Sequence, residues 1–153
     1  MIEDIAEAVV CASCWRSEGK QVVFTNGCFD LFHVGHLHTL RTAASVGDKL
    51  IVGVNSDESV RKLKGDERPI IPQQQRAEIV AAISGVDIVV VFNEETPLEL
   101  VRALRPHIIV KCETWAHNVV GKDDAGIVIL SEQLPGISTT EIITRIMGSV
   151  PHG

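Results

Sequence analysis

The sequence has no tyrosine, and among its 153 residues it has only four phenylalanines and two tryptophans. Such a chain offers few aromatic platforms on which nucleic-acid bases could stack. Its 14 Lys and Arg are outnumbered by 20 Asp and Glu, so it also lacks a general basic surface. We therefore predict that it does not bind nucleic acid. No apolar run reaches the roughly 18 residues of a membrane span, so no membrane segment is expected.

The N-terminus is acidic where a secretory signal would be basic, and a cytoplasmic location is therefore expected. Cysteine is scarce, with only Cys11, Cys14, Cys28 and Cys112. The C-x-x-C pair at positions 11 and 14 falls in a predicted helix, with no strand before it and no second cluster at zinc spacing. This pattern predicts reduced thiols and no protein metal site.

The length and the 45% hydrophobic content fit one globular domain with a core of its own. We expect a single domain over residues 1–153, in which 1–19 form a helical extension, 20–147 the core and 148–153 a tail, frayed over 150–153. No internal repeat or linker interrupts it.

Short runs rich in Val and Ile alternate with longer amphipathic segments. The predicted strands are residues 22–25, 50–54, 88–92, 108–111 and 127–130. The predicted helices are residues 2–15, 36–45, 72–84, 97–104 and 139–147. This alternation predicts an α/β fold with a doubly wound parallel sheet, which binds ligands at the carboxyl ends of its strands.

The segment after the first of these strands reads T-N-G-C-F-D-L-F-H-V-G-H over residues 25–36. His33 and His36 flank Gly35 at a predicted helix start, where free N–H groups and the helix dipole favour phosphate. The two imidazoles would add hydrogen-bond donors. The ordinary dinucleotide and P-loop fingerprints are absent. The alternative is a pair of surface histidines near a helix start.

This string resembles the cytidylyltransferase-like, H-x-G-H nucleotidyltransferase superfamily. Further segments are similar to its bacterial D-glycero-β-D-manno-heptose 1-phosphate adenylyltransferase branch: N-S-D at 55–57, L-K-G at 63–65, R-P at 68–69 and G-I-S-T-T at 136–140. The resemblance covers about residues 20–147. It implies a single Rossmann-like, doubly wound sheet of the nucleotidyltransferase type.

The resemblance implies that a sugar 1-phosphate attacks the α-phosphorus of a nucleoside triphosphate, with ATP favoured, and releases pyrophosphate. Because the attacking phosphate is already anionic, alignment and charge dispersal matter more than a strong base. Mg²⁺ would be bound mainly through the triphosphate. A homodimer is implied, as is a separate sugar kinase upstream in a pathway of ADP-heptose and lipopolysaccharide biosynthesis.

The resemblance also assigns roles to residues of this chain. The expected catalytic residues are His33, His36 and Lys64. The expected nucleotide-binding residues are Thr25, Asn26, Gly27, Cys28, Phe29, Gly35, Lys111, Ser138, Thr139 and Thr140. Asp30 is expected to organise its loop, and Arg76 to anchor a phosphate or a mobile loop. The alternatives are an exposed charged loop for Lys64, a plain helix cap for Ser138 and a surface ion pair for Arg76.

The distribution of basic residues points to the same place. Arg61, Lys62, Lys64, Arg68 and Arg76 are five of the 14 basic residues, and they fall in one short stretch of an acidic chain. We expect a loop that carries this cluster beside the H-x-G-H segment, as two anionic substrates would require.

The chain departs from the heptose branch at residues 111–115, where Lys-Cys-Glu-Thr-Trp replaces the usual Lys-Gly-Gly-Asp and an aromatic residue. The preferred base, A, C or G, therefore stays open. Glycerol-3-phosphate cytidylyltransferases are the nearest alternative, although they usually have arginine where this chain has Gln133. Flavin-adenylate synthesis is a further enzymatic alternative, and a nucleotide-binding regulatory module is the non-enzymatic one.

Overall fold

The computed structural model describes residues 1–149, so the predicted frayed tail at 150–153 lies outside the described residues. All strand pairs are parallel, in the order β1-β4-β3-β2-β5-β6. The strands are β1 (Ile2–Glu3), β2 (Val22–Gly27), β3 (Lys49–Asn55), β4 (Ile88–Phe92), β5 (Ile108–Cys112) and β6 (Ile127–Ser131). The helices are α1 (Ile5–Ser17), α2 (Val34–Ser45), α3 (Asp57–Lys64), α4 (Gln73–Ala81), α5 (Leu98–Leu104) and α6 (Thr139–Ser149), with short 3₁₀ turns η1 (Glu113–Trp115) and η2 (Lys122–Asp124).

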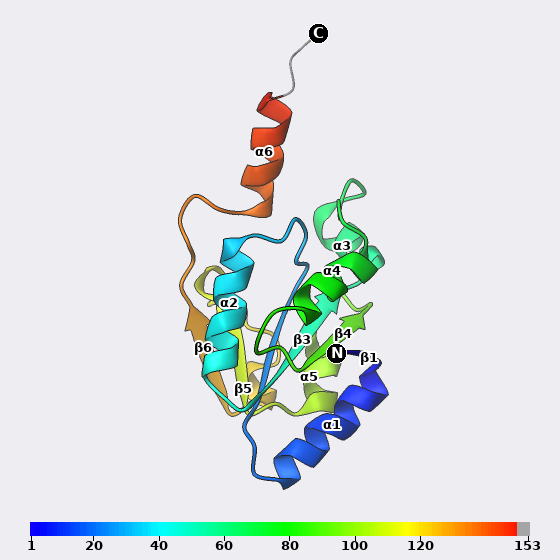
Figure 1. Ribbon diagram of the computed structural model, residues 1–153, viewed down its shortest axis with the longest axis vertical. Helices are drawn as coiled ribbons and strands as arrows, with labels where there is room; N and C mark the ends of the chain where they lie inside the picture. The colour runs from blue at the N-terminus through cyan, green and yellow to red at the C-terminus, as the bar shows by residue number, and fades with distance from the viewer. Residues whose placement is uncertain (150–153) are drawn as a thin grey trace.

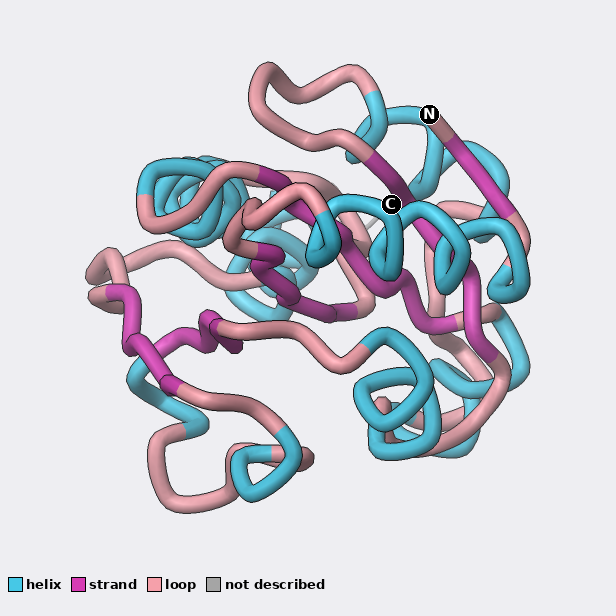
Figure 2. Tube along the Cα trace, turned by 90° about the horizontal axis from the view of Figure 1, so that it is seen from below, coloured by secondary structure: helices cyan, strands magenta, loops and turns pink. Residues whose placement is uncertain are grey.

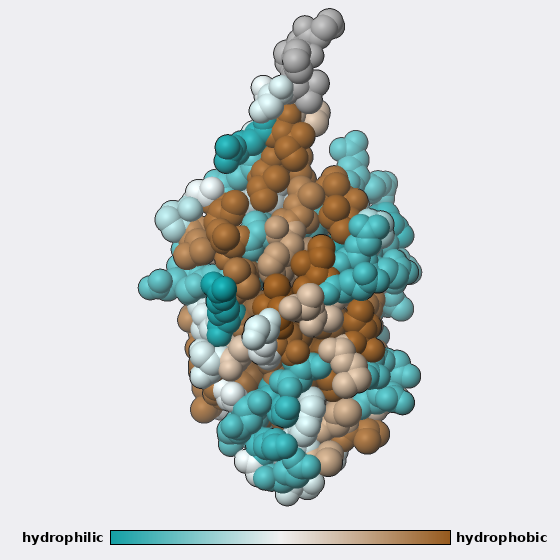
Figure 3. Space-filling model, viewed as in Figure 1, coloured by the Kyte–Doolittle hydropathy of each residue, from teal (hydrophilic) through white to brown (hydrophobic). Residues whose placement is uncertain are grey.

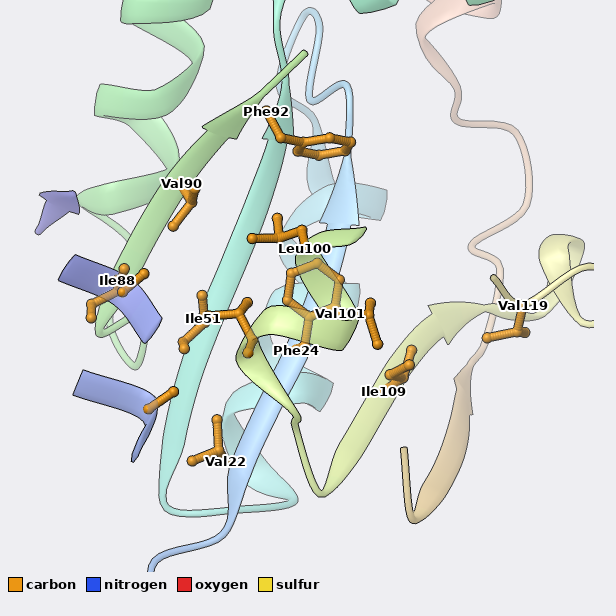
Figure 4. Packing of buried hydrophobic residues seen from close by; sticks show 13 residues of the cluster. Val22, Phe24, Ile51, Ile88, Val90, Phe92, Leu100, Val101, Ile109 and Val119 are labelled. Atoms are coloured by element: carbon orange, nitrogen blue, oxygen red, sulfur yellow. The ribbon is translucent and has the colours of Figure 1, made fainter. Parts of the chain in front are cut away.

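Helices cover both faces of the sheet, as Figures 1 and 2 show. On one face, Val22 and Phe24 of β2 pack with residues of α1 and α5, and Figure 4 shows Leu100 and Val101 beside Phe24. On the other face, Val23 packs with residues of α2 and α4. Because both faces are covered, the strands are almost continuously apolar, and the predicted α/β, doubly wound fold is confirmed.

The N-terminal segment differs from the prediction of one helix over 2–15. Ile2 and Glu3 instead form a short edge strand that pairs with β4. Asp4 then begins α1, because its side chain accepts a hydrogen bond from the Glu7 N–H at 2.8 Å. The helix buries Ala8 and Ala12 against the core, so this N-terminal helix packs onto the sheet.

The basic stretch that begins at Arg61 differs from the expected loop as well. Residues 57–64 form α3, which Ser56 caps by accepting from the Ser59 N–H at 3.2 Å, and Val60 is its buried anchor. The segment between α3 and α4 is short and starts at Gly65, whose φ of 99° suits glycine.

The strand order reverses at β2: β3 and β4 lie on one side of it, and β5 and β6 on the other. The loops that leave β2 and β5 therefore diverge, which opens a crevice at the carboxyl edge of the sheet. In Figure 1, α6 stands beyond this edge, at the opposite end of the molecule from α1. Within residues 1–149, no helix has the length and apolarity to cross a membrane.

Candidate active site

A cavity of about 500 Å³ opens at this edge of the sheet. All of the predicted catalytic and nucleotide-binding residues line it: Thr25, Asn26, Gly27, Cys28, Phe29, His33, Gly35, His36, Lys64, Lys111, Ser138, Thr139 and Thr140. Asp30 lines it as well. Further lining residues include Asn55, the first residue of the N-S-D segment, and Thr39, Glu95, Thr96 and Asn118. The last four belong to no motif identified in the sequence, and only the fold brings them to the cavity.

His33 and His36 form a reciprocal cap at the start of α2. His33 Nδ1 accepts from the Gly35 N–H at 3.1 Å, and His36 Nδ1 accepts from the His33 N–H at 3.4 Å. The rings stack with their centroids 3.8 Å apart. Because both Nδ1 atoms accept, the proton of each neutral ring sits on Nε2. Each ring therefore has an Nε2–H free to donate to a ligand.

Both imidazoles are neutral at neutral pH. Burial, together with the neighbouring His33, lowers the pKa of His36 to about 3, and Asp30 opposes this shift only in part. Burial also lowers the pKa of His33, against the opposing effect of Glu141. In the free protein the pair thus offers neutral hydrogen-bond donors, and an arriving anion would favour their protonation.

Gly35 is required by the geometry of this cap. A Cβ atom at position 35 would lie 2.9 Å from Cε1 and 3.0 Å from Nδ1 of His33, closer than real Cβ contacts allow. Any larger residue would push the His33 ring away from the helix start. The glycine of H-x-G-H therefore makes room for the first histidine.

Asp30 ties two surrounding elements to the site. Its buried carboxylate accepts from Arg68 Nε at 2.7 Å and from the N–H groups of Ile70 and Ile71 at 2.9 Å each. Burial alone would raise the pKa of Asp30, but these three donors outweigh it and hold the pKa below its usual value. The Asp30 carbonyl accepts from Thr139 Oγ1 at 2.7 Å, which attaches the start of α6 to the same residue.

Arg76 is not among the residues that line the cavity, and its expected role in anchoring a phosphate or a mobile loop stays a prediction. Its side chain is fully buried, and its donors are satisfied within the protein. Nε donates to the Ile71 carbonyl at 2.8 Å, and Nη2 donates to Asp57 Oδ1 at 2.8 Å. Nη1 donates to the Cys28 carbonyl. Arg76 thus fastens the segment before α4 to the turn after β2, in line with the loop-anchoring alternative and not with a surface ion pair.

Lys111 supports the floor of the cavity. Its Nζ donates to the Asn26 carbonyl at 3.2 Å, and burial lowers its pKa to about 8. Beside it, the buried atoms Thr25 Oγ1 and Asn26 Oδ1 have no hydrogen-bond partner in the described part of the chain. Buried polar atoms without partners are costly, so a polar ligand at this floor would relieve that cost.

The expected basic cluster is divided by the fold. Lys64, at the end of α3, lines the cavity, and its Nζ lies 5.8 Å from the ring centroid of Trp115. Arg68 lines it too. Arg61 and Lys62 do not line the cavity, and Lys62 pairs with Glu58 on the outer surface of α3. A helix turns its basic residues to different sides, so basic residues that are close together in the sequence do not all reach the cavity as expected.

At the start of α6, Ser138 Oγ accepts from the Glu141 N–H at 3.1 Å, as a helix cap does. This interaction leaves the neighbouring Thr140 at the cavity wall. The capping role of Ser138 and a role in phosphate binding at the same helix start are compatible.

Within residues 1–149, His, Cys, Asp and Glu side chains form no group of three that could hold a metal ion. Asp30, the buried carboxylate of the site, is occupied by its three donors. The residues present therefore fit a divalent ion that takes most of its ligands from phosphate oxygens and water, and do not fit a dedicated protein cage.

The cytidylyltransferase-like family model matches residues 24–145. The chain is 52% identical over 143 residues to the "Bifunctional protein HldE" of Syntrophotalea carbinolica, covering 90% of this chain and 29% of that protein. For the protein of the same name from Acidiphilium cryptum the identity is 47% over 144 residues, covering 91% and 30%. The chain thus spans about three-tenths of the length of these relatives.

A solved structure, that of the lipopolysaccharide core biosynthesis protein from Thermoplasma volcanium GSS1, is also similar. It has a TM-score of 0.59 at 27% identity and covers 74% of this chain and 98% of its own. The family model covers most of the chain, including the H-x-G-H segment and the cavity walls built on it. These matches confirm the predicted resemblance, and the chain belongs to the cytidylyltransferase-like family.

Proposed function

We propose that the protein transfers a nucleoside monophosphate from a nucleoside triphosphate, ATP in preference, to heptose 1-phosphate and releases pyrophosphate. The observation that carries this proposal is the stacked, neutral pair of His33 and His36, which caps α2 inside a cavity of substrate size. The segments similar to the heptose branch and the similarity to a solved lipopolysaccharide core biosynthesis protein support a sugar phosphate as the acceptor.

The reaction makes one bond and breaks another at the α-phosphorus. An oxygen of the sugar phosphate forms a bond to that phosphorus, and the bond to the bridging oxygen of the β-phosphate breaks, so that pyrophosphate leaves. The Nε2–H groups of His33 and His36 would donate to the phosphoryl oxygens on which charge accumulates. The free N–H groups at the starts of α2 and α6 would hold the remaining phosphate oxygens.

The floor and the rim of the cavity would serve the same substrates. Lys111 and the unpartnered Thr25 hydroxyl would engage the nucleotide from below. Lys64 would leave the Trp115 ring to reach a phosphate. A divalent ion, Mg²⁺ in our proposal, would neutralise charge on the triphosphate when bound.

Further features of the proposal concern the protein's surroundings. A sugar kinase activity must supply the sugar 1-phosphate, and the product would serve the synthesis of heptose-containing lipopolysaccharide. We propose that a separate sugar kinase, upstream in the pathway, supplies this activity. We keep the cytoplasmic location as a prediction.

The test is pyrophosphate release by the purified protein with Mg²⁺, in which ATP, CTP and GTP are each paired with heptose 1-phosphate, glycerol 3-phosphate and FMN. We expect release with ATP plus heptose 1-phosphate. Release with CTP plus glycerol 3-phosphate would move the chain to the cytidylyltransferase alternative. Binding of triphosphate without turnover on any acceptor would favour the regulatory module.

A further inference from the structure

Three cationic side chains line the cavity within the described residues: Lys64, Arg68 and Lys111. Lys64 is exposed on the rim, and Lys111 already donates to the Asn26 carbonyl and has a lowered pKa. Arg68 alone combines a permanent charge with a fixed position. Arg68 is expected in a basic cluster for two anionic substrates, but it is assigned to neither of them.

One edge of the Arg68 guanidinium is held in place by a hydrogen bond to Asp30. Its side chain is 15% exposed, and Nε donates to the fully buried Asp30 carboxylate at 2.7 Å. Because the guanidinium is planar, this bond sets the direction of the whole group. The Asp30 carboxylate is itself held by two backbone N–H groups, so the support is rigid.

The opposite edge of the guanidinium is free. Within residues 1–149, Nη1 and Nη2 of Arg68 have no hydrogen-bond partner, yet neither atom is among the buried polar atoms that lack one. Both atoms therefore keep some accessible surface, and Arg68 lines the cavity. A planar pair of donors of this kind matches two oxygens of one phosphate group.

We propose that Arg68 binds the phosphate of the acceptor substrate through Nη1 and Nη2. The inference rests on the proposed function and adds the subsite of the nucleophile to it. The triphosphate already has donors at the His pair and at the starts of α2 and α6. Arg68 comes instead from the connection between α3 and α4, on the β3 side of the sheet. A phosphate monoester offers terminal oxygens for a two-point contact and still has one left to attack.

Asp30 would hold the two phosphate sites in register. Its carboxylate fixes Arg68, and its carbonyl fixes Thr139 at the start of α6. Asp30 would then orient both the acceptor phosphate and the triphosphate. This shared support would help to align the attacking oxygen with the bond that breaks.

The experiment compares R68K, which keeps the charge but loses the paired donors, with the wild type. We expect the KM for heptose 1-phosphate to rise by about 10-fold or more, since a charged two-point contact is replaced by a point charge. The KM for ATP should stay within about twofold. Arg61→Gln is the control, because Arg61 lies on the neighbouring helix, is exposed and does not line the cavity.

A purely structural role for Arg68 would give another pattern. Loosening of the loop would alter kcat and both KM values together, which would overturn the proposal, as would an effect on the KM for ATP alone. A second variant, R68A, extends the test. If the paired N–H donors of Arg68 bind the acceptor phosphate, guanidinium ion added to R68A should lower the raised KM for heptose 1-phosphate. Failure of guanidinium to restore any binding in folded R68A would count against it.

The test separates this inference from the proposed function. If the wild type turns over no acceptor, the proposed reaction fails, and calorimetry with inorganic phosphate then decides the Arg68 site. Weaker phosphate binding by R68K than by the wild type and by R61Q would uphold a phosphate site at Arg68. Equal binding by all three proteins would overturn it.

Discussion

His36 serves the helix and the cavity with its two different nitrogen atoms. Nδ1 completes the cap of α2, while Nε2–H remains for a ligand. This division ties the ring's orientation to the backbone and leaves little conformational freedom to lose when substrate binds. Such preorganised donors are an effective means of stabilising charge in a transition state.

We expect His36→Ala to lower kcat by about 10²–10³-fold, the loss typical of one transition-state donor. The measurement is pyrophosphate release under saturating substrates, with circular dichroism to show that the fold persists. His38→Ala, two positions further along α2 and away from the cavity walls, should keep wild-type turnover. Near-normal activity of the His36 variant would remove the histidine from its proposed role.

The lowered pKa of His36 predicts a pH dependence of stability. Between about pH 3 and pH 6.5 the unfolded state binds a proton at this residue that the folded state does not. Protonation of His36 in the unfolded state therefore lowers the free energy of unfolding as the pH falls from 6.5 towards 3. Above pH 6.5 this residue causes no such loss. Urea unfolding should show a shallower decline of stability in His36→Gln than in the wild type over this range. Parallel curves would contradict the assignment.

Single residues also mark how far the sequence could predict the site. The H-x-G-H string, Lys64 and the G-I-S-T-T segment all lead to the cavity, because each has a recognisable local pattern. Thr39, Thr96 and Asn118 have none, since their place depends on where separate elements end.

At the scale of elements, two N-terminal caps set helix boundaries that the sequence pattern did not predict. A charged stretch from Arg61 onward suggested a loop, yet Ser56 caps it and Val60 anchors it as a helix. At the N-terminus, Asp4 sets a later helix start than apolar periodicity indicates, which frees Ile2 and Glu3 to pair with β4. The interior strands were easier to predict, because burial on both faces makes them continuously apolar.

Arg76 of α4 connects the start of α3, the turn after β2 and the segment before α4, so its loss should destabilise their packing. We expect Arg76→Met to destabilise the protein by about 3–5 kcal/mol, because it leaves the Asp57 carboxylate and two backbone carbonyls without their donor. Denaturant unfolding measures this loss. The matched variant Arg41→Met, at an exposed position of α2, should change stability by less than about 0.5 kcal/mol. Equal stabilities would show that the buried guanidinium is not a structural fastener.

At the scale of the whole molecule, α6 is the element least covered by the rest of the chain. None of its described residues is buried, and Ile146 and Met147 are 55% and 65% exposed. Figure 3 shows apolar surface along the visible side of this helix, continuing onto the body below it. Exposed apolar surface of this kind is common where proteins meet a partner.

The homodimer implied by the family resemblance is tested at this scale. We expect light scattering coupled to size exclusion to give twice the mass of one chain at micromolar concentration, and dilution to shift the mass towards one chain if the interface is weak. A mass of one chain at every concentration would contradict the expected homodimer.

The floor of the cavity has a consequence for how the protein is made. Lys111 Nζ donates to the Asn26 carbonyl across a separation of 85 residues, and β5 joins β2 only after two other strands and four helices have been synthesised. Closing this long loop costs more entropy than the local pairing of β2 with β3. A nascent chain released before β5 could pair β2 with β3 and still have no floor, so the ability to bind nucleotide should emerge in translation well after the first half of the sheet.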